Sequence, residues 1–310
     1  MKQNLAFVFP GQGSQQVGML GELAAQHGVI QETFKQASDA LGYDLWDLTQ
    51  SGPEAELNST DKTQPALLTA GVALWRLWCA EGGARPAQMS GHSLGEYTAL
   101  VCAGALSLAD GVRLVKLRGE AMQQAVPAGE GAMAAVLGLD DDKVEAACAA
   151  AAQGDVVAAV NYNSPGQVVI AGSAAAVGRA VELCKEAGAK RALELPVSVP
   201  SHCALMQPAA DKLAEALEAI EVIMPQCAVV QNVSAAASTS VEEIKQNLVA
   251  QLYSPVLWTD CVNTMVAAGA ETMIECGPGK VLSGLNKRIQ RSLSVASISD
   301  AAGFAKALEL

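Results

Sequence analysis

The turn Gly91-His92-Ser93-Leu94-Gly95 constrains the fold of this chain more than any other stretch, because it joins a short strand-like stretch to a helix-like one. The pattern G-x-S-x-G is typical of a sharp strand-to-helix turn that presents a nucleophilic serine above the edge of a sheet. Side chains at the two glycines would clash, since strand and helix backbones approach closely in such a turn. The alternative is an ordinary helix start, in which Ser93 only caps the helix and the glycines only turn the chain.

The segments around this turn alternate between strand-like and helix-like patterns. Residues 5–10, LAFVFP, predict a strand, and residues 63–79 carry apolar side chains at helical spacing. The alternation resumes after residue 202 and ends with a helix near Lys287, the last that the pattern predicts. Alternating strands and helices with short connections predict an α/β fold whose hydrolase-like core contains a mainly parallel sheet.

Residues 129–197 follow a different order, which is strand, helix, strand, strand, helix, strand. This βαββαβ order is the ferredoxin-like arrangement, which forms a compact unit. We therefore predict a small ferredoxin-like domain at 129–197, inserted into a larger α/β domain that is made of residues 1–128 and 198–310.

Composition and charge exclude several classes of function. With 51% hydrophobic and 17% charged residues, the chain has enough apolar side chains for a large buried core. Its formal net charge of −12 argues against nucleic acid and against anionic membranes as partners, because both require a positive field.

The cysteines and the first residues indicate the cytoplasm. Eight cysteines lie far apart with no C-x-x-C pair, which is typical of reduced and mostly buried thiols. With only three histidines in the chain, no metal site is expected. The apolar run before Pro10 has five residues, too few for the core of a signal peptide or for a membrane span.

A serine hydroxyl is a weak nucleophile at neutral pH and needs a base within hydrogen-bond distance. The histidines are His27, His92 and His202. His27 lies at a polar helix end and is expected at the surface, and the turn points the His92 side chain away from that of Ser93. His202 follows Pro200 between a strand and a helix, where an imidazole is well placed to face a cleft. His202 is therefore the favoured base, and the alternative is a packed or capping histidine.

Acyl transfer also needs N–H donors fixed in advance around the developing oxyanion. The N–H of Leu94 is one such donor, because Leu94 follows the nucleophile in the turn. A second is expected from the turn PGQGSQ, whose glycines allow close approach of the backbone and whose N–H groups should open a helix. This turn is not a dinucleotide fingerprint, since Gln16 stands where G-x-G-x-x-G requires glycine.

Six blocks of sequence together resemble one family. In chain order they are FPGQGSQ, GHSLGEYTAL, VKLRGEAM, NYNSPGQVVIAG, VPSHCALM and IECGPGKVL. Each block alone is a weak signal, but the six span nearly the whole chain. In these blocks the chain resembles the malonyl-CoA:acyl carrier protein transacylases of type II fatty acid synthesis, which are related to the acyltransferase domains of polyketide synthases.

The resemblance implies a role for each residue of a reaction centre. It implies that Ser93 is the acylated nucleophile and that His202 is its base. It implies that the N–H groups of Gln12 and Leu94 form the oxyanion hole. It also implies that the backbone carbonyl of Gln251 orients the imidazole in place of an acid, and no Asp or Glu stands out in the sequence as a buried third member.

The resemblance also implies contacts to the substrate. Arg118 would bind the malonyl carboxylate, because a planar guanidinium can donate two parallel hydrogen bonds to it. Alternatively, Arg118 is one cation of a solvated helix face. His92 is expected to shape the site, and Asn161 and Asn163 to line the cleft from the small domain. Ser201, just before the implied base, leaves the choice between malonyl and methylmalonyl groups open.

The expected reaction is a ping-pong transfer of malonyl from coenzyme A to the serine, and then to the pantetheine thiol of acyl carrier protein. No cofactor is expected, because the coenzyme A thioester is a substrate. Since carrier proteins are strongly acidic, exposed cations should bind this partner. The alternative is that these cations only belong to ordinary solvated faces. The candidates are Lys190, Arg191, Lys287, Arg288 and Arg291.

Two other classes of function remain open from the sequence. A serine esterase or thioesterase shares G-x-S-x-G and uses water as the acceptor, although Arg118 and the lack of an evident triad acid count against it. A non-catalytic acyl-CoA-binding module would keep the fold without the chemistry. The sequence does not decide between fatty acid and polyketide synthesis.

Overall fold

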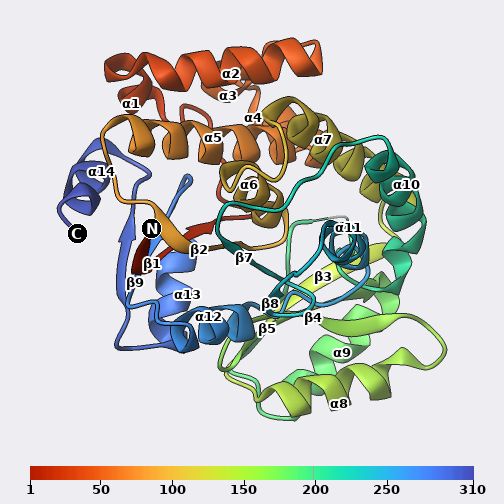
Figure 1. The fold of residues 1–310 in the computed structure, drawn as a ribbon. Coiled ribbons are helices and arrows are strands. Elements are labelled where there is room, and N and C mark those ends of the chain that lie inside the picture. The colour runs from red at the N-terminus through yellow and green to blue at the C-terminus, as the bar shows by residue number, and fades with distance from the viewer. Residues whose placement is uncertain (198) are drawn as a thin grey trace.

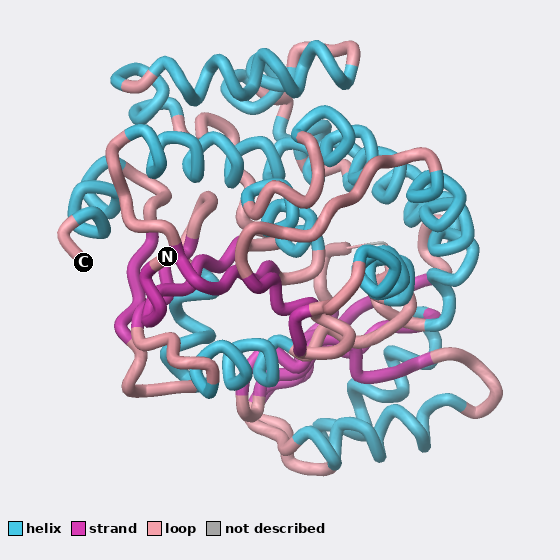
Figure 2. The backbone as a smooth tube through the Cα atoms, in the orientation of Figure 1, coloured by secondary structure: helices cyan, strands magenta, loops and turns pink. Residues whose placement is uncertain are grey.

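The computed structural model describes residues 1–197 and 199–310, and within them the strands form two separate β-sheets (Figure 1, Figure 2). Sheet A has six strands in the order β10-β9-β1-β2-β7-β8, and sheet B has four in the order β4-β5-β3-β6. Neighbours in sheet A pair in parallel except β7 and β8, whereas all neighbours in sheet B pair antiparallel. The predicted fold class is confirmed.

Sheet A draws its strands from both ends of the chain. They are β1 (Lys2–Phe9), β2 (Pro86–Gly91), β7 (Ala228–Gln231), β8 (Ala236–Ala237), β9 (Thr272–Glu275) and β10 (Ser294–Ser297). The helices that accompany it are α1 (Gly21–Gln26), α2 (Gly28–Leu41), α3 (Leu45–Ser51), α4 (Glu54–Leu57), α5 (Thr60–Ala80), α6 (Leu94–Cys102), α7 (Leu108–Ala125), η1 (Ala204–Met206, a 3₁₀-helix), α10 (Gln207–Glu218), α11 (Val241–Ala250), α12 (Trp258–Ala267), α13 (Val281–Ile289) and α14 (Ala301–Leu308). Among the helices in residues 1–197 and 199–310, none has the length and apolar character that crossing a membrane requires.

Side chains of β1 alternate between the two faces of sheet A, as the period of a strand requires. Leu5, Phe7 and Phe9 belong to the large core that includes α5 and α6. Ala6 and Val8 pack on the opposite face with α12 and α13. Figure 1 shows these two helix pairs on opposite sides of the sheet. Sheet A is therefore a buried middle layer, and ligands of such sheets bind at the carboxyl ends of the strands.

Sheet B and two helices form a second unit with its own apolar core. Its elements are β3 (Gly131–Leu137), α8 (Asp141–Ala152), β4 (Val157–Ser164), β5 (Gln167–Ser173), α9 (Ala174–Glu186) and β6 (Arg191–Glu194). The order of elements is the βαββαβ order predicted for a ferredoxin-like unit. The division of the chain into domains at 128/129 and 197/198 stays a prediction, and residue 198 lies outside the described residues.

Two local expectations from the sequence are wrong. The glycine turn after β1 does not open a helix, because residues 11–20 form turns and loop and α1 begins only at Gly21. After the helix near Lys287 the chain adds β10 and α14. Phe304 of α14 packs edge-on against Trp78 of α5, with ring centroids 6.0 Å apart, so tertiary packing helps to fix this short helix.

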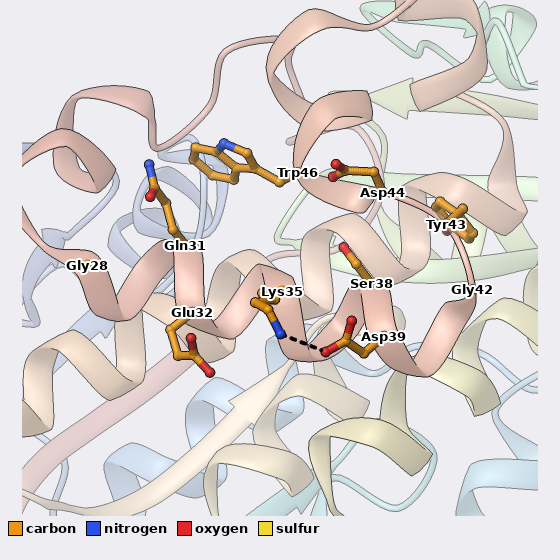
Figure 3. A pocket seen from close by; sticks show the side chains of 10 residues that line it. All are labelled: Gly28, Gln31, Glu32, Lys35, Ser38, Asp39, Gly42, Tyr43, Asp44 and Trp46. Carbon is orange, nitrogen blue, oxygen red and sulfur yellow. Dashed lines mark hydrogen bonds and ion pairs between the residues drawn. The ribbon is translucent and has the colours of Figure 1, made fainter.

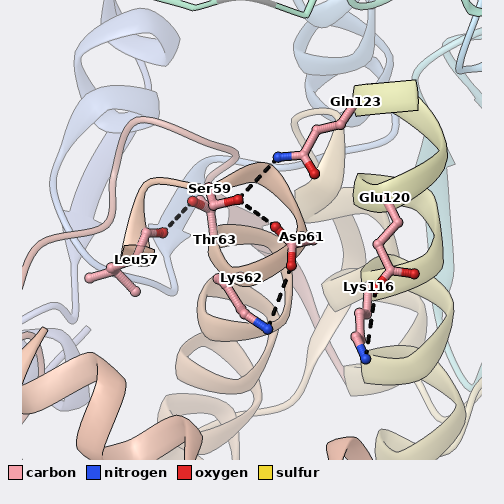
Figure 4. Close-up of polar contacts among 8 residues, drawn as sticks. All are labelled: Leu57, Ser59, Asp61, Lys62, Thr63, Lys116, Glu120 and Gln123. Atoms are coloured by element: carbon pink, nitrogen blue, oxygen red, sulfur yellow. Dashed lines mark hydrogen bonds and ion pairs between the residues drawn. The ribbon is translucent and has the colours of Figure 1, made fainter. Parts of the chain in front are cut away.

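Helices α5 and α7 approach closely where α5 begins (Figure 4). A Cβ on Gly119 of α7 would lie 2.7 Å from the carbonyl oxygen of Thr60, so a larger residue would push the helices apart. Gln123 of α7 also donates to the hydroxyl of Ser59 at 3.1 Å. Arg118, the neighbour of Gly119, lies in this stretch of α7 and donates to Gln64 of α5.

Candidate active site

Ser93 stands between β2 and α6 on a sharp turn, as predicted. Its backbone has φ 52° and ψ −109°, a conformation that residues other than glycine rarely adopt. A Cβ on Gly91 would lie 1.9 Å from the carbonyl carbon of Gly95, and one on Gly95 would lie 2.0 Å from the carbonyl oxygen of Phe9. Both glycines are therefore required by the close approach of backbones. The Ser93 hydroxyl faces His202 instead of capping α6.

Two further glycine turns pack against this one. A Cβ on Gly11, after β1, would lie 2.7 Å from the carbonyl oxygen of His92. A Cβ on Gly277, after β9, would lie 2.5 Å from the ring of Pro10. Three turns that follow three parallel strands of sheet A thus interlock at the carboxyl edge of the sheet.

His202 lies directly against the nucleophile. Its Nε2 is 2.8 Å from Oγ of Ser93, and its Nδ1 is 2.6 Å from the carbonyl oxygen of Gln251. A carbonyl only accepts, so Nδ1 carries the hydrogen and Nε2 can accept the serine proton. Burial, and then the positive charge of Arg118, lower the pKa of His202 to about 3. The imidazole is therefore neutral at pH 7, which is the form a general base requires.

The guanidinium of Arg118 is fully buried behind Ser93, so this residue is not on a solvated helix face. Its Nη2 donates to Oγ of Ser93 at 3.2 Å and to Oε1 of Gln251 at 3.1 Å. Its Nη1 donates to Oε1 of Gln64 at 2.9 Å. Its Nε has no hydrogen-bond partner within the described part of the chain. These partners are neutral, and a buried cation in such surroundings favours an incoming carboxylate.

A cavity of about 540 Å³ opens in front of Ser93 and His202. His92 and Asn161 line its wall, as expected for residues that shape the site. Asn163 stands behind the wall, where its Oδ1 is 2.7 Å from Nε2 of His92. Burial lowers the pKa of His92, so its ring is also neutral at pH 7 and donates this hydrogen bond.

Leu94 and Gln12 both adjoin this centre. Leu94 is the first residue of α6, so its N–H has no acceptor within that helix. Gln12 lines the cavity from the turn after β1, and its Oε1 accepts from Nε2 of Gln64 at 3.4 Å. Because this turn leads into no helix, the position of the Gln12 backbone at the cavity depends on the conformation of the loop and not on a helix N-terminus.

His27 is not part of this centre. It stands between α1 and α2, partly exposed, with Nδ1 3.5 Å from the carboxylate of Glu81. The sequence predicted a surface position for it.

The exposed cations predicted to receive a partner lie in two stretches of the chain, one at the start of β6 and one at the end of α13 and just after it. They are Lys190, Arg191, Lys287, Arg288 and Arg291. Lys190 and Arg191 stand at the start of β6. Nη1 of Arg288 donates to Oε1 of Gln167 at 2.8 Å, so α13 reaches the start of β5. Val169, two residues along β5, lines the cavity. We call these five residues the basic patch.

A second hollow, of about 870 Å³, lies on the surface of α2 (Figure 3). Its lining includes Glu32, Lys35 and Asp39, and the ion pair of Lys35 with Asp39 at 3.1 Å runs along α2. None of its lining residues borders the Ser93 cavity. It is larger than that cavity, but none of the residues of the reaction centre lines it.

Three buried polar residues at this centre were missed from the sequence. Gln64 bonds to the guanidinium, Asn232 accepts the N–H of Ser93 at 2.7 Å, and Glu96 accepts the N–H of Asn232 at 2.6 Å. Contrary to the expectation from the sequence, Glu96 is a fully buried acid, although it contacts Asn232 and not the imidazole. The signal that could have found Glu96 and Gln64 is a polar side chain within an apolar helical run.

Comparisons with known proteins show the family. A sequence model described as acyl transferase domain matches residues 6–304. Malonyl CoA-acyl carrier protein transacylase of Escherichia coli is 60% identical over 305 residues, which are 98% of this chain and 99% of that protein. The protein of the same name from Bacillus subtilis is 48% identical, over 96% of this chain and 93% of that protein.

Solved structures agree with these relatives. An acyl carrier protein S-malonyltransferase from Vibrio cholerae has a TM-score of 0.96 and 59% identity, over 98% of this chain and 99% of that chain. A malonyl-transacylase in complex with a type II PKS acyl-carrier protein has a TM-score of 0.98 and 57% identity, over 99% of both chains. The chain therefore belongs to the malonyl CoA-acyl carrier protein transacylase family of acyl transferases.

Proposed function

We propose that this chain transfers a malonyl group from malonyl-CoA to the pantetheine thiol of an acyl carrier protein. Relatives that match over nearly their whole length carry this activity in their names, and one was solved with an acyl-carrier protein. For this chain, one observation carries the proposal. A buried guanidinium, that of Arg118, lies 3.2 Å from the hydroxyl of Ser93, so a carboxylate receptor adjoins a nucleophile.

In the first half-reaction Nε2 of His202 takes the proton of the Ser93 hydroxyl as Oγ attacks the thioester carbonyl carbon. The carbonyl oxygen becomes an oxyanion, which the N–H groups of Gln12 and Leu94 stabilise. The carbon–sulfur bond then breaks, and the protonated His202 returns the proton to the departing coenzyme A thiolate. The carbonyl of Gln251 keeps Nδ1 protonated throughout, a role that a carboxylate plays in the serine protease triad.

In the second half-reaction the thiol of the carrier protein replaces coenzyme A and runs the same steps in reverse. Arg118 holds the malonyl carboxylate during both, which fixes the acyl group while the thiols exchange. The serine, the imidazole and the backbone donors supply every step, so we propose no resident cofactor. Eight free cysteines are consistent with a reducing compartment, and we propose the cytoplasm.

Intact-mass spectrometry after mixing with malonyl-CoA tests this function. We expect a stable malonyl adduct on Ser93 that disappears when carrier protein is added. Release of free malonate without carrier protein would instead identify a hydrolase, the alternative that shares the G-x-S-x-G turn. An unchanged mass with bound malonyl-CoA would identify a binding module. Both outcomes contradict the proposed transfer.

We further propose that the basic patch receives the acidic carrier protein. Its members are exposed, and one of them, Arg288, contacts Gln167, which lies two residues along β5 from Val169 of the cavity wall. On a chain with a net charge of −12, such a patch gives an acidic partner a local attractive field.

The double substitution Arg191→Glu and Arg288→Glu tests this surface. We expect kcat/KM for carrier protein to fall by about tenfold at low salt and by less at high salt, since exposed charges are screened. The matched control reverses two exposed cations elsewhere, Lys35→Glu on α2 and Lys306→Glu on α14. Equal slowing of the malonyl-CoA half-reaction, or the same loss in the control, would contradict a docking role.

A further inference from the structure

Asn232 follows β7, and its side chain bridges the two sides of the turn that carries Ser93. Its Oδ1 accepts the N–H of Ser93, and its Nδ2 donates to the carbonyl of Gly91, both at 2.7 Å. A backbone N–H only donates and a carbonyl only accepts, so these contacts fix which way the amide points. One fully buried side chain therefore ties the end of β2 to the nucleophile.

The turn needs such a tie because its backbone is strained. Ser93 has φ 52°, a sparsely populated backbone region for a residue with a side chain, so the turn stores strain. Such a conformation persists only where surrounding contacts impose it. Nε2 of Gln251 adds two of them, at 3.1 Å to the carbonyl oxygen of Ser93 and at 3.3 Å to Oδ1 of Asn232. Both backbone polar groups of Ser93 are thus held by side chains from distant segments.

Asn232 is itself anchored by the buried carboxylate of Glu96. One oxygen of Glu96 accepts the N–H of Asn232 at 2.6 Å, and the other accepts from Nε2 of Gln231 at 3.0 Å. Oε1 of Gln231 accepts from Asn247 at 3.1 Å and also from Ser238, which leaves its Nε2 to face Glu96. Glu96 lies in the first turn of α6, the helix that begins directly after Ser93. The same helix therefore anchors Asn232, which in turn holds the backbone of Ser93.

We propose that Asn232 is a positioning residue for malonyl transfer. Through Gly91 and Ser93 it holds the turn so that the hydroxyl meets His202 and the N–H of Leu94 faces the oxyanion. The inference rests on the proposed function for the reaction, although the clamp would serve any reaction of Ser93. Asn232 does not line the cavity, so its loss should lower kcat and leave KM for malonyl-CoA nearly unchanged.

The test is Asn232→Ala in the full chain, with two readouts. The first is the rate at which phenylmethylsulfonyl fluoride labels Ser93, followed by mass spectrometry. In this step Oγ bonds to sulfur, fluoride leaves and His202 takes the proton, so neither malonyl nor carrier protein is needed. The second is kcat and KM for malonyl transfer. We expect the labelling rate and kcat to fall by about tenfold or more, equivalent to about 1.4 kcal/mol, with KM within about twofold.

The matched control is Asn286→Ala. Asn286 is also fully buried, but it lies on α13 and accepts its hydrogen bond from Trp258 of α12, at 3.0 Å. This variant should lose thermal stability and keep the wild-type labelling rate for each folded molecule. Wild-type labelling in folded Asn232→Ala, or an equal loss in both variants, overturns the inference.

If Asn232→Ala does not fold, Asn232→Asp decides the question. Aspartate keeps an acceptor for the N–H of Ser93 but has no donor for the carbonyl of Gly91. Slower labelling of this folded variant supports the clamp, and wild-type labelling overturns it. Failure of the proposed function looks different, since wild-type protein would then be labelled at Ser93 yet transfer no malonyl group.

Discussion

Ser93→Ala is expected to abolish both malonyl transfer and the covalent adduct while the protein stays folded, because the change removes a single hydroxyl at a cavity wall. His202→Ala is expected to slow acylation of Ser93 by about 10²–10⁴-fold, the range typical of losing a general base. Rapid mixing with malonyl-CoA, followed by intact-mass spectrometry, measures both effects. Circular dichroism and thermal unfolding establish that each variant is folded.

His92→Ala is the matched comparison for loss of an imidazole from the same cavity. Nε2 of His92 bonds to Asn163 and not to the nucleophile, so we expect this variant to keep most of the acylation rate. A His202→Ala protein that turned over normally while His92→Ala did not would show that the base is assigned to the wrong residue.

Arg118→Ala is expected to shift the preference from malonyl-CoA toward acetyl-CoA by about 30-fold or more. Without the guanidinium, the malonyl carboxylate would be desolvated and unpaired, at a cost of roughly 2–5 kcal/mol for a buried charge pair. Each 1.4 kcal/mol changes a ratio of kcat/KM values by about tenfold. An acetyl group has no carboxylate and should lose little. The measurement is kcat/KM for both thioesters in wild type and variant.

Arg118→Lys separates charge from geometry. An ammonium keeps the charge but not the two-pronged donation, so it should recover only part of the lost preference. A ratio of malonyl to acetyl activity that stayed unchanged in both variants would remove Arg118 from the substrate site. The esterase alternative would then be open again.

Local sequence patterns predicted two features around this site, the turn at Ser93 and the order of elements in sheet B. The turn at Ser93 was predictable because G-x-S-x-G combines a steric requirement with a strand-like stretch before it and an apolar helix-like stretch after it. The βαββαβ order of sheet B was predictable because each element is short, regular and bounded by turn residues. Both predictions depend on neighbours in sequence, which is the range that periodicity covers.

The contacts that complete the site could not be predicted in this way. Arg118 lies on α7, and its hydrogen-bond partners Gln64 and Gln251 come from α5 and from the end of α11. Such contacts depend on how helices pack, which periodicity does not encode. Asn232 was missed for the same reason, since nothing local separates an amide after a strand from an ordinary turn residue.

At this edge of the sheet, whether one of the three interlocked turns tolerates a substitution depends on segments that are distant in sequence. Gly11, Gly95 and Gly277 each leave less room than a methyl group needs, and the atoms they meet belong to another turn or, for Gly95, to the end of β1. A side chain at any one of them would therefore displace backbone or a proline ring in a segment that is distant in sequence. Protein engineers who wish to vary substrate choice should leave these glycines in place and diversify the cavity wall, for example at Ser201 and Val197, where side chains face open space.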